Sequence, residues 1–119
     1  MIQEDKELLI KDLCARLPYG IKAQDYDDEP PFTIVAYDGL CFWDDDEWEH
    51  KVDKIKPYLF PLSSITEEQI KEFNSITQKC STYIGKSILL TDFCNKHHID
   101  WRGLIEKGLA LDATGLNIY

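Results

Sequence analysis

Two strand-like runs flank the dipeptide Asp38-Gly39, and this pattern constrains the fold more than any other in the chain. Residues 32–37 and 40–43 are rich in β-branched and aromatic side chains, which favour extended backbone. An Asp-Gly pair between two such runs is the strongest short-range signal for a hairpin. The sequence therefore predicts an antiparallel β-hairpin over residues 32–43.

Weaker patterns surround this hairpin. Ile21 and Ala23 alternate with polar residues and predict a short strand, and residues 52–58 predict a third strand whose Pro57 should lie at a sheet edge. The strongly acidic residues 44–50 are expected to form a loop. Residues 109–111 predict a last short strand, followed by a tail at 113–119.

The spacing of apolar residues predicts an amphipathic helix over residues 4–17. Acids in its first turn and Arg16 in its last suit the helix dipole, and Pro18 should end it. The expected buried face consists of Leu9, Ile10, Leu13, Cys14 and Leu17.

Two further helices are expected in the second half. Thr66 and Gln69 form a capping-box pattern ahead of a stripe of Ile70, Phe73, Ile76 and Cys80. Gly85 is expected to interrupt the pattern. A helix over 87–97 should bury Leu89, Leu90, Phe93 and Cys94, and Asp100 should cap a short turn that ends at Gly108. The expected fold is a single α+β domain over residues 1–119, with an antiparallel sheet of three to four strands packed against about three helices.

The charge of this chain is concentrated in one stretch. Residues 25–53 hold eleven acids and one base, whereas the whole chain of 119 residues has a net charge of −9. Residues 1–24 balance, and residues 54–119 carry one net positive charge. Charge concentrated in one region creates an electric field that acts on binding partners, whereas charge spread over the whole surface mainly aids solubility.

The run Asp44, Asp45, Asp46, Glu47, Trp48 and Glu49 is the first candidate site. Its carboxylates suit a divalent cation, but adjacent acids on an extended segment point to opposite faces and cannot converge on one ion. A second interpretation is a contact surface for a basic partner, with Trp43 or Trp48 as an aromatic anchor. A third is a solvated loop that protects the hairpin from edge-to-edge association.

Two other groups are candidates for chemistry. Cys94, His97, His98 and Asp100 could form a metal corner or an acid–base pair, although no second ligand pair or placed nucleophile is evident, and cap and packing roles also fit. Trp101 and Arg102 could stack on nucleic-acid bases, but phosphates would be repelled by so acidic a chain, and Trp101 equally suits the core.

The cysteines and the hydropathy of the chain indicate the cellular location of the protein. Cys14, Cys41, Cys80 and Cys94 form no CxxC pair and are expected to be small buried hydrophobes, with disulfides or metal as alternatives. The N-terminus lacks a secretory pattern, and no apolar run approaches the ~20 residues that span a bilayer. We therefore expect a cytoplasmic protein that does not bind membranes.

Three blocks of sequence carry a resemblance to a known group of proteins. They cover residues 7–20, 55–64 and 96–119, which is a little under half of the chain. Together they resemble an uncharacterised family of short proteins from Bacteroides-type gut bacteria and their phages and mobile elements. The resemblance implies an intracellular bacterial or phage setting and a shared scaffold in which residues 21–53 and the region between the helices vary. It implies no activity, cofactor or catalytic residue.

These observations lead to one main hypothesis and two alternatives. The first is a non-enzymatic interaction module, without a cofactor, whose acidic residues 44–49 contact the basic surface of another protein. One alternative is a phage-type acidic mimic of nucleic acid that occupies the groove of a host or defence protein. The other is a small metal-dependent hydrolase that uses Cys94, His97, His98 or Asp100. A homodimer through an exposed hairpin edge is also compatible with the sequence.

Overall fold

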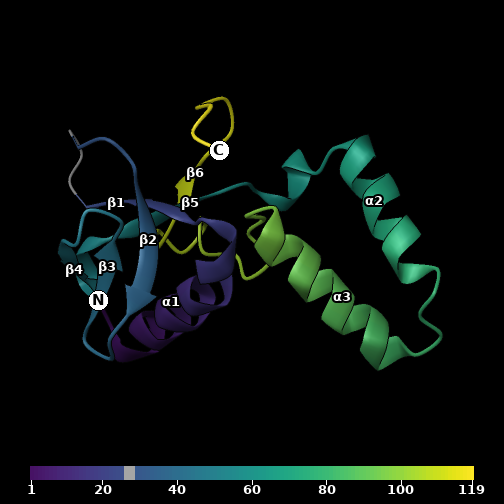
Figure 1. Cartoon of the computed structure of the whole chain (residues 1–119), viewed down its shortest axis with the longest axis horizontal. Coiled ribbons are helices and arrows are strands. Elements are labelled where there is room, and N and C mark those ends of the chain that lie inside the picture. The colour runs from purple at the N-terminus through teal and green to yellow at the C-terminus, as the bar shows by residue number, and fades with distance from the viewer. Residues whose placement is uncertain (26–28) are drawn as a thin grey trace.

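A computed structural model describes residues 1–25 and 29–119 of the chain, which form three α-helices and a six-stranded mixed sheet (Figure 1). The strand order is β4-β3-β2-β1-β5-β6, and neighbours are antiparallel except for the parallel pair β5 and β6. The strands span Lys22–Gln24 (β1), Phe32–Tyr37 (β2), Cys41–Asp44 (β3), Glu49–Lys51 (β4), Lys56–Leu59 (β5) and Leu111–Asp112 (β6). The α+β class is confirmed, but the sheet has more than the expected three to four strands. The strand predicted over residues 109–111 is present, shifted to Leu111–Asp112, as β6, whereas β4 lies where a loop was expected.

The predicted hairpin is present as β2 and β3. Tyr37 pairs with Phe42 across the sheet, and Oδ1 of Asp38 accepts hydrogen bonds from the backbone N–H groups of Leu40 and Cys41, both at 2.8 Å. Gly39 has a φ of +96°, a backbone conformation that glycine adopts at little cost. The turn is therefore held by one carboxylate and one glycine, both visible in the sequence.

The loop expected over residues 44–50 is wrong at both ends. Asp44 is the last residue of β3, and Glu49 and His50 begin β4, which pairs with β3 at the edge of the sheet. An edge strand tolerates charge because its outward side chains stay in water, and Glu49 and Lys51 are exposed. The acidic segment thus forms a second, very tight hairpin.

The edge position expected for Pro57 is correct only locally. Residues Val52–Lys54 form a 3₁₀ turn, and β5 lies inside the sheet between β1 and β6. Pro57 pairs with Ala23 of β1, whereas β6 pairs only with Tyr58 and Leu59. Because β6 is so short, it does not extend alongside Pro57. Proline has no backbone N–H to donate, but no neighbouring strand on that side needs a hydrogen bond from this position.

Helix α1 (Gln3–Arg16) covers one face of the sheet (Figure 1). It ends at Arg16, as Pro18 predicts, and continues as a 3₁₀ turn over Leu17–Tyr19. Of its expected apolar face, Leu9 and Leu13 are fully buried, and Ile10, Cys14 and Leu17 pack against them in part. The main core combines these two residues with Ile21, Ala23, Ile34, Phe42, Val52, Ile55, Leu59, Leu104, Leu109 and Ala110.

Helix α1 also carries a buried ion-pair network that its apolar pattern does not reveal. Asp12 and Arg16 are both fully buried, and Nε of Arg16 donates to Oδ2 of Asp12 at 2.9 Å. The same guanidinium donates to the carbonyl oxygens of Cys94 at 3.3 Å and Ile99 at 2.7 Å. Nε of Arg102 reaches Asp12 from the C-terminal segment at 3.1 Å. The network therefore joins α1 to two distant parts of the chain.

The end of the chain is docked in the structure, although residues 113–119 were expected to be a tail. The Tyr119 hydroxyl donates to the Tyr58 carbonyl at 2.7 Å and accepts from the Lys22 N–H at 2.9 Å. Its ring stacks on that of His98, with centroids 3.9 Å apart. Burial and the charge of Arg16 lower the pKa of His98 to about 4, so its imidazole is neutral at pH 7. The last residue thus links β1, β5 and the segment after α3.

Helices α2 (Glu67–Thr77) and α3 (Tyr83–Lys96) extend away from the sheet as a V-shaped arm (Figure 1). The predicted capping box at Thr66 and Gln69 is confirmed, with bonds of 3.1 and 3.0 Å. Helix α3 begins earlier than expected, because Thr82 caps it through the Gly85 N–H at 3.0 Å. Gly85 lies inside the first turn, where a β-carbon would collide with Sγ of Cys80.

Burial along the arm differs from the expected pattern. Phe73 packs against Phe93 with ring centroids 5.5 Å apart, and Phe93 and Cys94 are buried. Ile70, Ile76 and Leu90 were expected to be buried but are exposed by 41–49%, because two helices without a third layer cannot enclose a full core. All four cysteines are free thiols, with Cys94 buried and the other three half-buried.

We predict that Arg16→Met lowers the free energy of unfolding by about 3 kcal/mol, because it leaves the buried Asp12 carboxylate without its main partner. The double variant Asp12→Leu/Arg16→Met should be more stable than the single one, since no central charge remains unpaired. Urea denaturation monitored by circular dichroism measures both. A single variant as stable as the double one would contradict this account.

Candidate functional site

The acidic run folds into a turn organised by its first residue. Asp44 is buried, and its Oδ1 accepts from the backbone N–H groups of Asp46 at 2.9 Å and Trp48 at 3.0 Å. Its own N–H donates to the Trp48 carbonyl at 3.0 Å. Glu47 closes the turn with a φ of 64°, a left-handed conformation that costs a non-glycine residue roughly 1 kcal/mol. The turn is therefore a fixed structure in which Asp44 has a structural role.

His50 lies between two carboxylates. Its Nδ1 is 2.6 Å from Oδ2 of Asp25, and its Nε2 is 2.8 Å from Oδ2 of Asp44. The ring stacks flat on Phe32, with centroids 4.0 Å apart and planes 9° apart. Asp25 follows β1, Asp44 ends β3, His50 lies in β4 and Phe32 begins β2. The imidazole thus joins four segments of the fold. In the charge pattern of the sequence, these segments appear only as parts of one acidic stretch.

The electrostatics of this triad favour a protonated imidazole. Burial by itself would lower the pKa of His50, but the hydrogen bonds and charges of Asp44 and Asp25 outweigh it and raise that pKa. For Asp44, burial would raise the pKa, and the bonds from His50 and from two backbone N–H groups lower it overall. Oδ1 of Asp25 is buried without a hydrogen-bond partner among the described residues.

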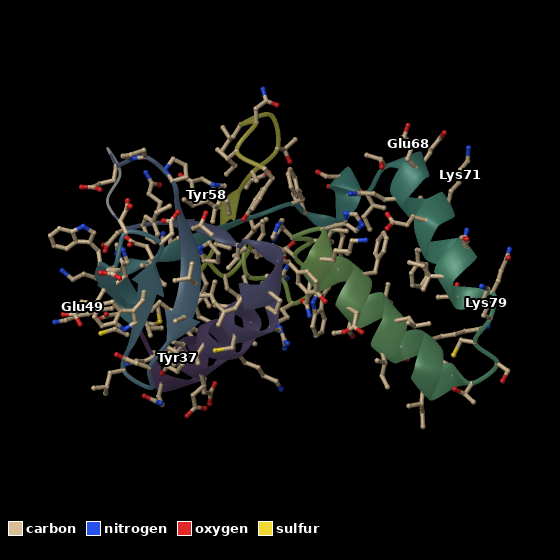
Figure 2. All side chains as sticks on the ribbon, in the orientation of Figure 1. Tyr37, Glu49, Tyr58, Glu68, Lys71 and Lys79 are labelled. Atoms are coloured by element: carbon tan, nitrogen blue, oxygen red, sulfur yellow. The ribbon has the colours of Figure 1, made fainter. Side chains whose placement is uncertain are left out.

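This triad lies beside a groove of about 530 Å³, which we call the acidic groove. Trp48, exposed by 70%, stands beside it, and Glu49 lies at the outer end of the molecule, opposite the helical arm (Figure 2). The groove is lined by Asp25, Glu29, Pro30, Pro31, Phe32, Asp44, Asp46, Trp48, Glu49 and His50. Carboxylates, an indole, two prolines and a phenyl ring therefore meet in one hollow.

The residues of the predicted partner surface have three different positions. Asp46, Trp48 and Glu49 are exposed and line the groove, and Asp44 also lines it but is buried. Asp45 and Glu47 are exposed but do not line the groove. Trp43, the other candidate anchor, donates from its indole to Oδ2 of Asp38 at 2.9 Å and so supports the first hairpin.

The sequence did not single out Asp25, Glu29, Phe32 or His50 as site residues. Asp25 and Glu29 were counted only as part of the charge, and His50 was assigned to a loop. The signal that could have found His50 is the second hairpin, whose register sets Phe42 opposite His50 and Trp43 opposite Glu49. Residues 26–28, which belong to the same acidic stretch, lie outside the described residues.

The four candidate residues near the end of α3 do not converge. Cys94 is buried, and burial raises the pKa of its thiol. Nε2 of His97 is 3.0 Å from Glu72 of α2, and His98 stacks on Tyr119. Both Asp100 oxygens accept backbone N–H bonds, from Leu104 at 2.8 Å and Ile105 at 2.9 Å. The capping role expected for Asp100 is confirmed, although the segment it caps is a series of turns instead of a helix.

Trp101 and Arg102 also have partners within the fold. The Trp101 indole donates to Asn95 at 3.1 Å, and its ring packs against the cluster of Phe93, Cys94 and Ile99. The guanidinium of Arg102 lies 4.1 Å from the Trp101 ring centroid while its Nε bonds to Asp12. These contacts occupy the groups that would otherwise stack on bases.

The imidazole of His50 is fully engaged within the fold. Both imidazole nitrogens of His50 are held by carboxylates, so it cannot exchange a proton with a substrate without losing one of these bonds. Over residues 1–25 and 29–119, no group of three His, Cys, Asp or Glu side chains is placed to hold a metal ion. Over the same residues, no helix is long and apolar enough to cross a membrane.

Comparison with known proteins gives no relative from which a role could be transferred. No family model, no curated protein and no solved structure matches this chain. The interpretation of the groove therefore depends on its own geometry and charge.

We predict that His50→Gln destabilises the protein in a pH-dependent manner. Because the pKa of His50 is raised on folding, its stabilising contribution is complete below the unfolded-state pKa of about 6.5 and declines as pH rises through the higher folded-state value. The loss in His50→Gln should be roughly 1–2 kcal/mol larger at pH 6 than at pH 9. Urea titrations across this range measure it, and a loss independent of pH would show that the ion pairs contribute nothing.

Proposed function

We propose that this protein is a non-enzymatic interaction module that binds a basic segment of another protein in the acidic groove. The observation that carries the proposal is the exposed Trp48 beside Asp46 and Glu49, on a turn fixed by Asp44 and His50. A rigid site binds at a lower entropic cost than a mobile loop. A cytoplasmic bacterial or phage setting, implied by the resemblance of residues 7–20, 55–64 and 96–119, belongs to the same proposal.

The lining of the groove suits an arginine or lysine side chain. The positively charged end can lie over the Trp48 ring in a cation–π contact and pair with the carboxylates of Asp46, Glu49 or Glu29. The aliphatic part of such a side chain can pack on Pro30, Pro31 and Phe32.

The charge of the surrounding stretch adds a long-range contribution. Eleven acids and one base between residues 25 and 53 attract a positively charged partner before contact and speed association. This attraction is screened by salt, with a Debye length of about 10 Å at 0.1 M. The proposal therefore requires binding that weakens steeply as salt rises.

A matched pair of variants separates the groove from total charge. Asp46→Asn/Glu49→Gln removes two carboxylates that line the groove, and Asp45→Asn/Glu47→Gln removes two neighbours that do not. Both change the net charge equally. We predict that the first variant weakens binding to arginine-rich peptides at least about tenfold and the second by only about twofold.

The measurement is a titration of arginine-rich peptides followed by Trp48 fluorescence, repeated at low and high salt, with Trp48→Phe as the signal control. Equal losses in the two variants would show that net charge, and not the groove, controls binding. Affinity independent of salt would contradict the proposal altogether.

A nucleic-acid mimic is the second candidate, and the observation that favours it is the cluster of exposed acids Asp45, Asp46, Glu47 and Glu49 within one turn. Carboxylates at such a turn can stand in for backbone phosphates. For a captured target that binds DNA, we predict competition between DNA and this protein, measured by fluorescence anisotropy of labelled DNA. Simultaneous binding of both would exclude mimicry. The metal-dependent hydrolase receives no support from Cys94, His97, His98 and Asp100, which lie with separate partners.

A further inference from the structure

The outer face of α3 is apolar and uncovered. Tyr83, Ile84 and Ile88 are exposed by 85%, 73% and 57%. Together with Ser87, Thr91 and Asp92 they line a shallow groove of about 320 Å³ on the helical arm. A group of exposed isoleucines such as this one belongs more often to a contact surface than to ordinary solvent-exposed surface.

This face continues a buried one. Tyr83, Ile84, Ser87, Ile88 and Thr91 have the spacing i, i+1, i+4, i+5 and i+8 and so lie on one side of the helix. The next positions on that side are Cys94 and Asn95, which are buried where α3 meets the main body of the fold. The stripe is therefore covered at one end of α3 and open along the rest.

The charge of the arm differs from that of the rest of the chain. Residues 66–97 contain four acids and four bases, whereas the whole chain carries −9. The strongly acidic end, marked by Glu49, lies at the opposite end of the molecule from the arm residues Glu68, Lys71 and Lys79 (Figure 2). Two copies of this chain therefore repel each other least when they approach through their arms.

We propose that a second copy of this chain covers the outer face of α3, with the two α3 helices packed antiparallel about a two-fold axis. Such an interface is self-complementary, because the same patch contacts itself. An axis that passes between Ser87 and Ile88 sets Ile88 of one copy opposite Ser87 of the other, and Ile84 opposite Thr91. Each large side chain then faces a small one, so the helices can approach closely.

Two helices of this length bury less than the roughly 800 Å² per partner of a standard interface. The dimer is therefore expected to depend on protein concentration and to coexist with monomer.

The test compares three forms of the full chain by analytical ultracentrifugation over a wide range of concentration. The forms are the wild type, Ile84→Glu/Ile88→Glu on the patch, and Ser75→Glu/Gln78→Glu as a control. The control adds the same two charges at exposed positions of the arm outside the patch. Circular dichroism and the urea midpoint establish that each variant folds as the wild type does.

The wild type and the control should dimerise reversibly, and the patch variant should show at least about a hundredfold weaker dimerisation. The wild-type dimer should persist or tighten as salt rises, because screening reduces the repulsion between two acidic chains. This response is the opposite of that expected for the acidic groove, so the two proposals fail separately. A wild type that stays monomeric, or a patch variant that dimerises like the wild type, would overturn the proposal.

Discussion

The guanidinium group of Arg16 connects α1 to the C-terminal end of α3 and to Ile99, which follows that helix. It pairs with Asp12 on its own helix and donates to the carbonyl oxygens of Cys94 and Ile99, near the end of the arm. These donors and acceptors are buried, and a buried charge without partners would be strongly unfavourable. Satisfying this one cation therefore holds the C-terminal end of α3 against α1.

The two ends of the molecule present opposite kinds of surface. One end carries the acidic groove, where Asp44 and His50 hold a turn rigid and leave Trp48 exposed. The other end carries an electrically balanced arm with an uncovered apolar stripe. The proposed basic partner and the proposed second copy would use different surfaces, which are separated along the 42 Å length of the molecule, so the two proposed contacts would not compete.

Much of the local structure could be predicted because its causes are local. Asp38 and Gly39 make their own turn, Pro18 ends α1, and the capping box at Thr66 forms between neighbours. Burial along α2 and α3 was predicted poorly, because Ile70 has the spacing of a core residue but no third layer to pack against. The acidic groove was predicted only in part, because His50 meets Asp25 across 25 positions of sequence.

The sequence by itself determined where the charge lies, where the first hairpin turns, where α1 ends and where α2 begins, because each depends on residues a few positions apart. Only the tertiary structure decided which acids have a structural role and which line a groove. Asp44 and Asp46 are nearly equivalent in the sequence, yet Asp44 is buried and held by His50, whereas Asp46 is exposed in the groove. The physical reason is that burial and hydrogen bonding depend on the register of β3 against β4, and a pattern of residue types does not contain that register.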